Sequence, residues 1–61
     1  MNAKEVLKIL YGCGFRQVSQ KGSHLKLSKD EKKVIVPIHG TKDIPMGTLK
    51  SIEKQSGIKL R

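Results

Sequence analysis

The stretch Lys21–Ser28, which reads KGSHLKLS, decides the fold because it places a tight turn directly before a strand with two different faces. We predict a strand over Ser23–Ser28, where apolar and polar residues alternate with the period of a half-buried strand. Leu25 and Leu27 fall on one face, and His24 falls on the other together with a lysine. If the leucines face a core, the imidazole faces solvent beside a positive charge. Such an imidazole is suited to proton transfer near neutral pH.

The segments on both sides of this strand complete a predicted sheet. Phe15–Gln20 is predicted as the preceding strand, although its poor periodicity leaves its register open. Lys21–Gly22 is predicted as the hairpin turn that joins the two strands. After the charged turn Lys29–Lys32, the β-branched run Lys33–Ile38 (KVIVPI) is predicted as the third strand. Pro37 cannot donate a ladder hydrogen bond and therefore indicates an edge strand or a strand end. The result is a three-stranded antiparallel meander.

A first helix is predicted before the sheet. Asn2 and Glu5 have the spacing of a capping box, and apolar residues then recur at helical spacing over residues 3–12. Gly12 or Gly14 is expected to end this helix, because glycine is the usual residue just past a helix C-terminus.

A second helix is predicted to begin near Asp43–Pro45 and to end at Gly57, a C-cap glycine that Ile58 follows as its hydrophobic contact. Its apolar stripe has three members, Met46, Leu49 and Ile52. Both helices can cover the leucine face of the sheet, which leaves the other face to water and ligand. The predicted fold class is therefore α+β with the order αβββα, a three-stranded antiparallel sheet with two helices on one face, in a single domain over residues 1–61.

The charge balance indicates a polyanionic partner. Thirteen Lys and Arg residues against five Asp and Glu give a net charge of +8 on 61 residues, which is typical of a nucleic-acid-binding protein. Lysines that serve solubility alone are one alternative, and attraction to an acidic membrane is another. The chain has neither a basic run nor a long apolar stretch, so no membrane partner is predicted.

Cysteine usage and the first ten residues bear on the compartment. Cys13 is the single cysteine, so no internal disulfide can form, and no Cys/His cluster predicts a zinc site. We expect Cys13 to be a small core residue, and we expect Tyr11 and Phe15 to lie in the core, with stacking on RNA bases as the alternative role. The segment MNAKEVLKIL carries charges inside its apolar part and lacks a small-residue cleavage site, unlike a signal peptide. The expected localisation is cytoplasmic.

Five short motifs, spread in order over nearly the whole chain, resemble one known family. They are Gly14-Phe15, Gly22-Ser23-His24, Val36–His39 (VPIH), Gly47–Ile52 (GTLKSI) and Gln55–Ile58 (QSGI). With these motifs the sequence resembles the HicA toxins, also called YcfA-like proteins, of bacterial and archaeal toxin–antitoxin pairs. Each motif is weak alone, but their common order and spacing make the resemblance specific.

The resemblance implies a double-stranded-RNA-binding-like fold and the toxin of a type II toxin–antitoxin system. It also implies an endoribonuclease, an mRNA interferase that stops translation by cutting mRNA. A HicB antitoxin would neutralise it in a heteromeric complex, so mRNA and a HicB-type protein are the implied partners. In this family the histidine of the Gly-Ser-His motif is the catalytic residue, and His24 occupies that position here.

The chemistry of the residues agrees with this function. Metal-dependent nucleases hold Mg²⁺ with converging carboxylates, whereas the acidic residues here are scattered over two helices, a turn and a loop. Metal-independent cleavage without a cofactor is therefore predicted, with the 2′-hydroxyl of RNA as the nucleophile. We assign His24 as general base or acid, and Lys21 and Lys26 as the cations that hold phosphate. Ser23 is the predicted hydrogen-bond donor of the RNA-binding segment, and Gly22 supplies its backbone geometry.

One residue and two functions remain open from the sequence. His39 lies in the loop after the third strand, where a structural hydrogen bond is its expected role and a secondary part in catalysis is the alternative. The alternative function is a non-catalytic RNA-binding module that uses the same basic surface and reads A-form shape. A DNA-binding subunit is a weaker alternative, because the two helices lie at opposite ends of the chain and form no helix-turn-helix.

Overall fold

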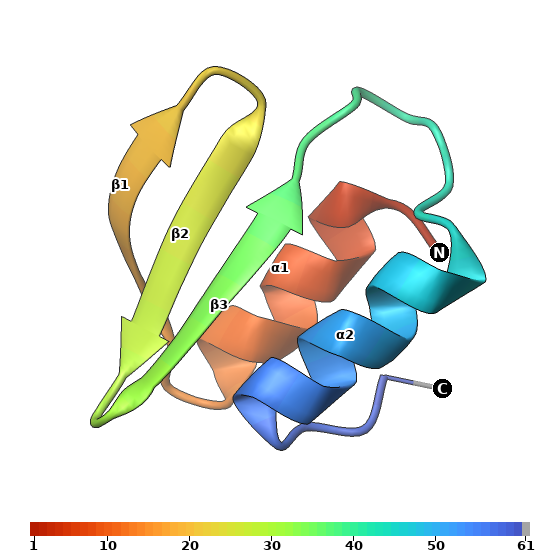
Figure 1. Ribbon diagram of the computed structural model, residues 1–61. Coiled ribbons are helices and arrows are strands. Elements are labelled where there is room, and N and C mark those ends of the chain that lie inside the picture. Colours follow the sequence, from red (N-terminus) through yellow and green to blue (C-terminus); the bar gives the residue numbers. More distant parts are fainter. Residues whose placement is uncertain (61) are drawn as a thin grey trace.

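Two helices flank three strands along the chain in the computed structural model, which describes residues 1–60 (Figure 1). The elements are α1 (Ala3–Gly12), β1 (Arg16–Lys21), β2 (His24–Lys29), β3 (Lys32–Pro37) and α2 (Met46–Ser56). The predicted α+β class and the order αβββα are confirmed. Arg61, the last residue of the predicted domain, lies outside the described residues.

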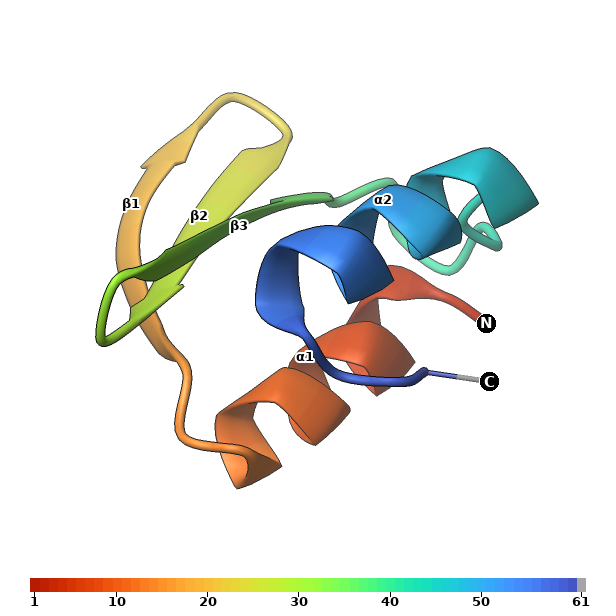
Figure 2. The ribbon, with the colours of Figure 1, turned by 60° about the horizontal axis from the view of Figure 1, so that its bottom comes forward.

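The three strands form one antiparallel sheet in the order β1-β2-β3, as predicted for a meander. Both helices lie on the same side of this sheet, with α2 beside β3 (Figure 2). Between the layers is a core of buried apolar residues, Ala3, Val6, Leu10, Phe15, Leu25, Leu27, Val34, Val36, Ile44, Leu49, Ile52 and Leu60. The alternation of β2 is therefore confirmed, because both of its leucines point into this core and His24 is exposed.

The hairpin between β1 and β2 turns one residue later than predicted. Lys21 pairs with His24, so the two turn residues are Gly22 and Ser23 and the prediction of Lys21–Gly22 is wrong. Gly22 has a φ of 59° and Ser23 does not have a positive φ, which is the pattern of a type II′ turn. The boundaries of all three strands differ from the prediction by one residue at each end, as expected for boundaries read from sequence.

Strand β1 has no buried face. All six of its residues are exposed, including the apolar Val18, which is 54% exposed. A bulge between Gln17 and Ser19 shifts its register against β2. Because neither helix covers this strand, no alternation of apolar and polar residues is required there. This explains the poor periodicity of the sequence in this segment.

Both ends of α1 are stabilised by specific hydrogen bonds. The predicted capping box is present, since Glu5 N donates to Asn2 Oδ1 and Asn2 N donates to Glu5 Oε1, each at 3.0 Å. At the other end, Cys13 is the C-cap and Gly14 follows with a φ of 99°. Lys29 Nζ donates to the Cys13 carbonyl oxygen at 2.5 Å, which places a cation at the negative end of the helix dipole. Cys13 is partly buried and packs against the core.

Two residues predicted to be apolar contacts of the core are exposed instead. Tyr11 is 43% exposed because it follows the buried Leu10 by one residue, which turns it about 100° away around the helix. Met46 is 53% exposed, since the first turn of α2 extends past the end of β3 (Figure 2). Phe15, by contrast, is buried as predicted.

The end of α2 and the edge of β3 agree with the prediction. Gly57 is a left-handed C-cap with a φ of 74°, and Ile58 packs against the core. Strand β3 is an edge strand, and its Ile35 N donates to Gln55 Oε1 of α2 at 3.2 Å. Pro37 lies two residues after Ile35, so its backbone nitrogen also points away from β2. The N–H that proline lacks would therefore make no hydrogen bond within the sheet.

Candidate active site

The face of the sheet that points away from the helices carries His24, and we call it the outer face. Strand register defines its members, because paired residues of neighbouring strands point to the same side of a sheet. Its three cross-strand rows are Lys21, His24 and Pro37; Ser19, Lys26 and Ile35; and Arg16, Ser28 and Lys33. His24 thus lies in the middle of a row at the hairpin end of the sheet, with Lys21 on one side.

Positive charge dominates the outer face. Four of the residues in its rows are cations, Arg16, Lys21, Lys26 and Lys33, and none is a carboxylate. Such a surface attracts a polyanion and favours phosphate contacts. Arg16 and Lys33 are not among the site residues predicted from the sequence. The alternation within KVIVPI could have identified Lys33, but the bulge at Val18 hides the register that brings Arg16 to this face.

Three of the predicted site residues meet in one hollow on the outer face. His24, Lys21 and Lys26 line it together with Ser19 and Ile35, and its volume is about 570 Å³. His24 and Lys21 are exposed and Lys26 is half-buried, so all three are available to a ligand. The hollow therefore gathers two ammonium groups and an imidazole, a combination that favours an anion.

The two predicted residues of the turn have a different position. Gly22 and Ser23 do not line this hollow but form the turn that leads into His24. A Cβ atom at Gly22 would meet nothing within 4 Å, so the glycine is required by its positive φ and not by lack of space. The Ser23 carbonyl oxygen accepts a hydrogen bond from Ile38 N at 2.6 Å. Hydrogen-bond donation by the Ser23 hydroxyl to RNA stays a prediction.

A second hollow adjoins the first at His24 and reaches the loop before α2. Its volume is about 360 Å³, and it is lined by His24, Ile35, Pro37, His39, Pro45 and Thr48. His39 is exposed, and within residues 1–60 its imidazole has no hydrogen-bond partner. The expected structural hydrogen bond of His39 is thus not seen within these residues, and its part in catalysis stays a prediction. The tertiary structure instead brings both histidines to one hollow.

A family model described as the HicA toxin of bacterial toxin-antitoxin matches residues 3–58. The chain belongs to the HicA toxin family. A curated relative, the probable mRNA interferase HicA of Pseudomonas fluorescens, is 39% identical over 59 residues, which cover 97% of this chain and 98% of the relative. The resemblance inferred from the five motifs is thereby confirmed. The matched range contains every helix and strand, so the rows of the outer face and both histidines belong to the HicA-like region.

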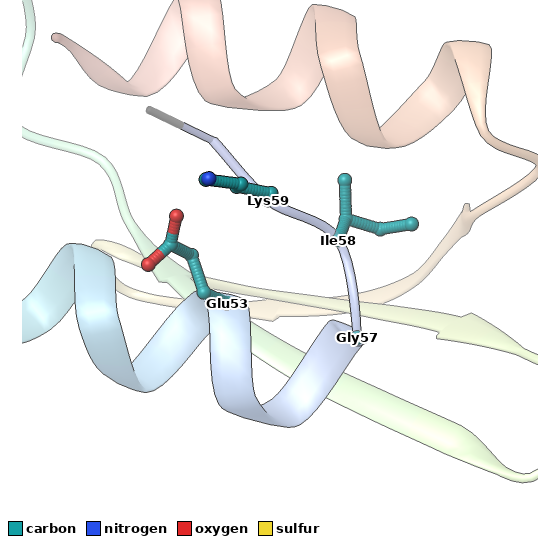
Figure 3. Close-up of a pocket in the computed structure, with 4 residues that line it drawn as sticks. All are labelled: Glu53, Gly57, Ile58 and Lys59. Carbon is teal, nitrogen blue, oxygen red and sulfur yellow. The ribbon is translucent and has the colours of Figure 1, made fainter.

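One feature of this HicA family member at the end of α2 is structural. A further hollow of about 330 Å³, at the C-terminal end of α2, is lined by Glu53, Gly57, Ile58 and Lys59 (Figure 3). The Glu53 carboxylate accepts a hydrogen bond from Leu60 N at 2.8 Å through Oε2. This contact attaches the C-terminal segment to α2, so we assign it to stability.

Two kinds of site are not seen in the part of the chain that the structure describes. Among residues 1–60, no three His, Cys, Asp or Glu side chains are grouped so that they could hold a metal ion. Over the same residues, neither helix has the length and apolar character needed to span a bilayer. The rows of the outer face themselves present imidazole, ammonium, guanidinium and hydroxyl groups.

Proposed function

We propose that this chain is the toxin of a type II toxin–antitoxin pair and an endoribonuclease that cleaves mRNA and so blocks translation. The observation that carries the proposal is the position of His24 on a face with four cations and no carboxylate. Membership of the HicA family and the name of the relative, probable mRNA interferase, support the same activity. The proposed substrate places this activity in the cytoplasm.

The proposed reaction uses the nucleophile that RNA itself carries. The 2′-oxygen attacks the adjacent phosphorus, the bond from phosphorus to the 5′-oxygen breaks, and a 2′,3′-cyclic phosphate forms. His24 serves as general base for the 2′-hydroxyl proton or as general acid for the leaving 5′-oxygen. Lys21 and Lys26 neutralise the charge that develops on the phosphate oxygens, because both line the hollow that contains His24. Gly22 and Ser23 hold His24 at the start of β2 through the tight turn.

Independence from metal is part of the proposal, and the positions of the carboxylates support it. The Glu5 carboxylate caps α1, and Asp43 Oδ1 lies 3.3 Å from the Met1 amino group. Glu53 holds the C-terminal segment, and the other two acidic residues, Asp30 and Glu31, form the turn between β2 and β3. None of these five side chains belongs to the rows of the outer face, so within residues 1–60 no pair of acidic side chains converges on the proposed scissile phosphate.

The proposed regulator is a HicB-type antitoxin that forms a heteromeric inhibitory complex. Inhibition requires the partner to cover His24 or to compete for the cations that hold RNA. An acidic surface placed over residues 22–26 would do both, because these residues adjoin Lys21 and include Lys26. Complementary charge would speed the encounter, and burial of this surface would slow dissociation.

The test is cleavage of a defined RNA by the purified protein in the presence and absence of excess EDTA. We expect cleavage under both conditions, 2′,3′-cyclic phosphate or 3′-phosphate ends, and no cleavage when 2′-deoxynucleotides replace the ribonucleotides. Loss of activity with EDTA that Mg²⁺ restores would contradict metal independence. Tight binding of RNA without any cleavage would contradict the nuclease and support the non-catalytic RNA-binding module instead.

A further inference from the structure

We propose that His39 is a second catalytic residue of this site, so that His24 and His39 together transfer the two protons that RNA cleavage requires. The inference rests on the proposed ribonuclease function. It assigns a role to a residue whose imidazole makes no hydrogen bond or ion pair within residues 1–60.

Strand pairing sets the relative position of the two histidines. Pro37 is the cross-strand partner of His24, and it is the last residue of β3. The ladder continues one residue further, because Ile38 N donates to the Ser23 carbonyl oxygen at 2.6 Å. His39 follows this last contact by one residue, in the loop that begins where β3 ends, so the pairing of β2 with β3 brings it near the start of β2. Both side chains line one hollow of about 360 Å³.

The chemistry of the reaction needs two groups in such an arrangement. The attacking 2′-oxygen loses a proton and the leaving 5′-oxygen gains one, and an in-line displacement puts these oxygens on opposite sides of the phosphorus. A single imidazole cannot contact both oxygens at once. Two imidazoles that line one hollow can each contact one of these oxygens, so that one accepts a proton while the other donates its own.

The surroundings of the hollow suit proton transfer between these groups and the substrate. Its other lining residues are Ile35, Pro37, Pro45 and Thr48, of which only Thr48 carries a polar side-chain group. Among residues 1–60, no ionisable side chain other than the two imidazoles lines it. The nearest cations on the outer face, Lys21 and Lys26, line the adjoining hollow, where they would hold the phosphate.

The loop keeps its conformation without the imidazole of His39. The His39 carbonyl oxygen accepts a hydrogen bond from Lys42 N at 3.2 Å, which is a contact between backbone atoms. The end of the loop is held by Ile44 N, which donates to the Met1 carbonyl oxygen at 2.8 Å, and by the buried Ile44 side chain. Substitution of His39 should therefore leave the fold intact, and a catalytic role can be separated from a structural one.

The experiment compares cleavage of a short RNA by the wild-type chain and by His39→Ala, His39→Gln and Lys42→Ala. Lys42→Ala is the matched control, because it removes an exposed side chain from the same loop. We expect both His39 variants to lower kcat by at least about 100-fold with little change in KM, the usual size of a general acid–base contribution. We also expect them to lose one limb of the bell-shaped dependence of kcat/KM on pH, while Lys42→Ala behaves like the wild type.

The outcomes separate this inference from the function on which it rests. A wild-type chain that cleaves RNA together with a His39→Ala variant of equal activity would overturn the role of His39 alone. A loss confined to KM, or a lowered melting temperature in both His39 variants, would also overturn it in favour of binding or structure. A wild-type chain that cleaves no RNA would instead overturn the proposed nuclease.

Discussion

Replacing one lysine on the outer face by glutamine should change how RNA affinity depends on salt. Each phosphate contact to single-stranded RNA adds about 0.7 to the slope of log affinity against log salt concentration. If the four cations of the outer face each contact one phosphate, the slope is about −2.8, and affinity falls about 50-fold between roughly 50 and 200 mM salt. Lys26→Gln removes one contact, so the slope becomes about −2.1 and the same change in salt lowers affinity about 20-fold.

The assay is fluorescence anisotropy with a labelled single-stranded RNA over a series of salt concentrations. All proteins carry His24→Ala, so that the RNA stays uncleaved. The control is Lys8→Gln, which removes the same charge from an exposed position on α1, on the side of the sheet away from the outer face. We expect the control to keep the original slope. Equal reductions of the slope in both variants would show that net charge binds RNA and that the outer face has no special part in it.

Three further predictions concern catalysis, the core and inhibition. His24→Ala should abolish RNA cleavage and growth arrest with an unchanged melting temperature, because an exposed side chain adds little packing; full activity would refute the assignment. In urea unfolding followed by circular dichroism, Leu27→Ala should lower the free energy of unfolding by about 2 to 5 kcal/mol. Val18→Ala, at an exposed position, should lower it by about 0.5 kcal/mol or less. That loss is comparable with the whole stability of about 3 to 9 kcal/mol expected for 61 residues, and equal effects of the two variants would contradict the core. Addition of the antitoxin should protect His24 from diethylpyrocarbonate, and unchanged labelling in a saturated, inactive complex would show inhibition from a remote site.

Features set by contacts between near neighbours in the chain could be predicted from the sequence. The capping box of Asn2 and Glu5 and the left-handed Gly57 depend only on residues within one or two turns of a helix. The alternation of β2 depends on a strand with one buried face, and it correctly separated Leu25 and Leu27 from His24. The motifs that these local structures contain were enough to indicate the HicA family.

The tertiary structure decided everything that depends on another element. Whether a face is buried depends on what covers it, so only the packing of the helices shows that β1 and Tyr11 are exposed. The bulge at Val18 sets the register that brings Arg16 to the outer face, and a bulge leaves no clear mark in a strand without a buried face. His24 and His39 are fifteen positions apart in sequence, yet they line one hollow. The cause is the pairing of β2 with β3, which the hydrogen bond from Ile38 N to the Ser23 carbonyl oxygen extends. The sequence therefore determined which chemical groups are present and which local structures hold them, whereas strand register and helix packing determined which of those groups face one another.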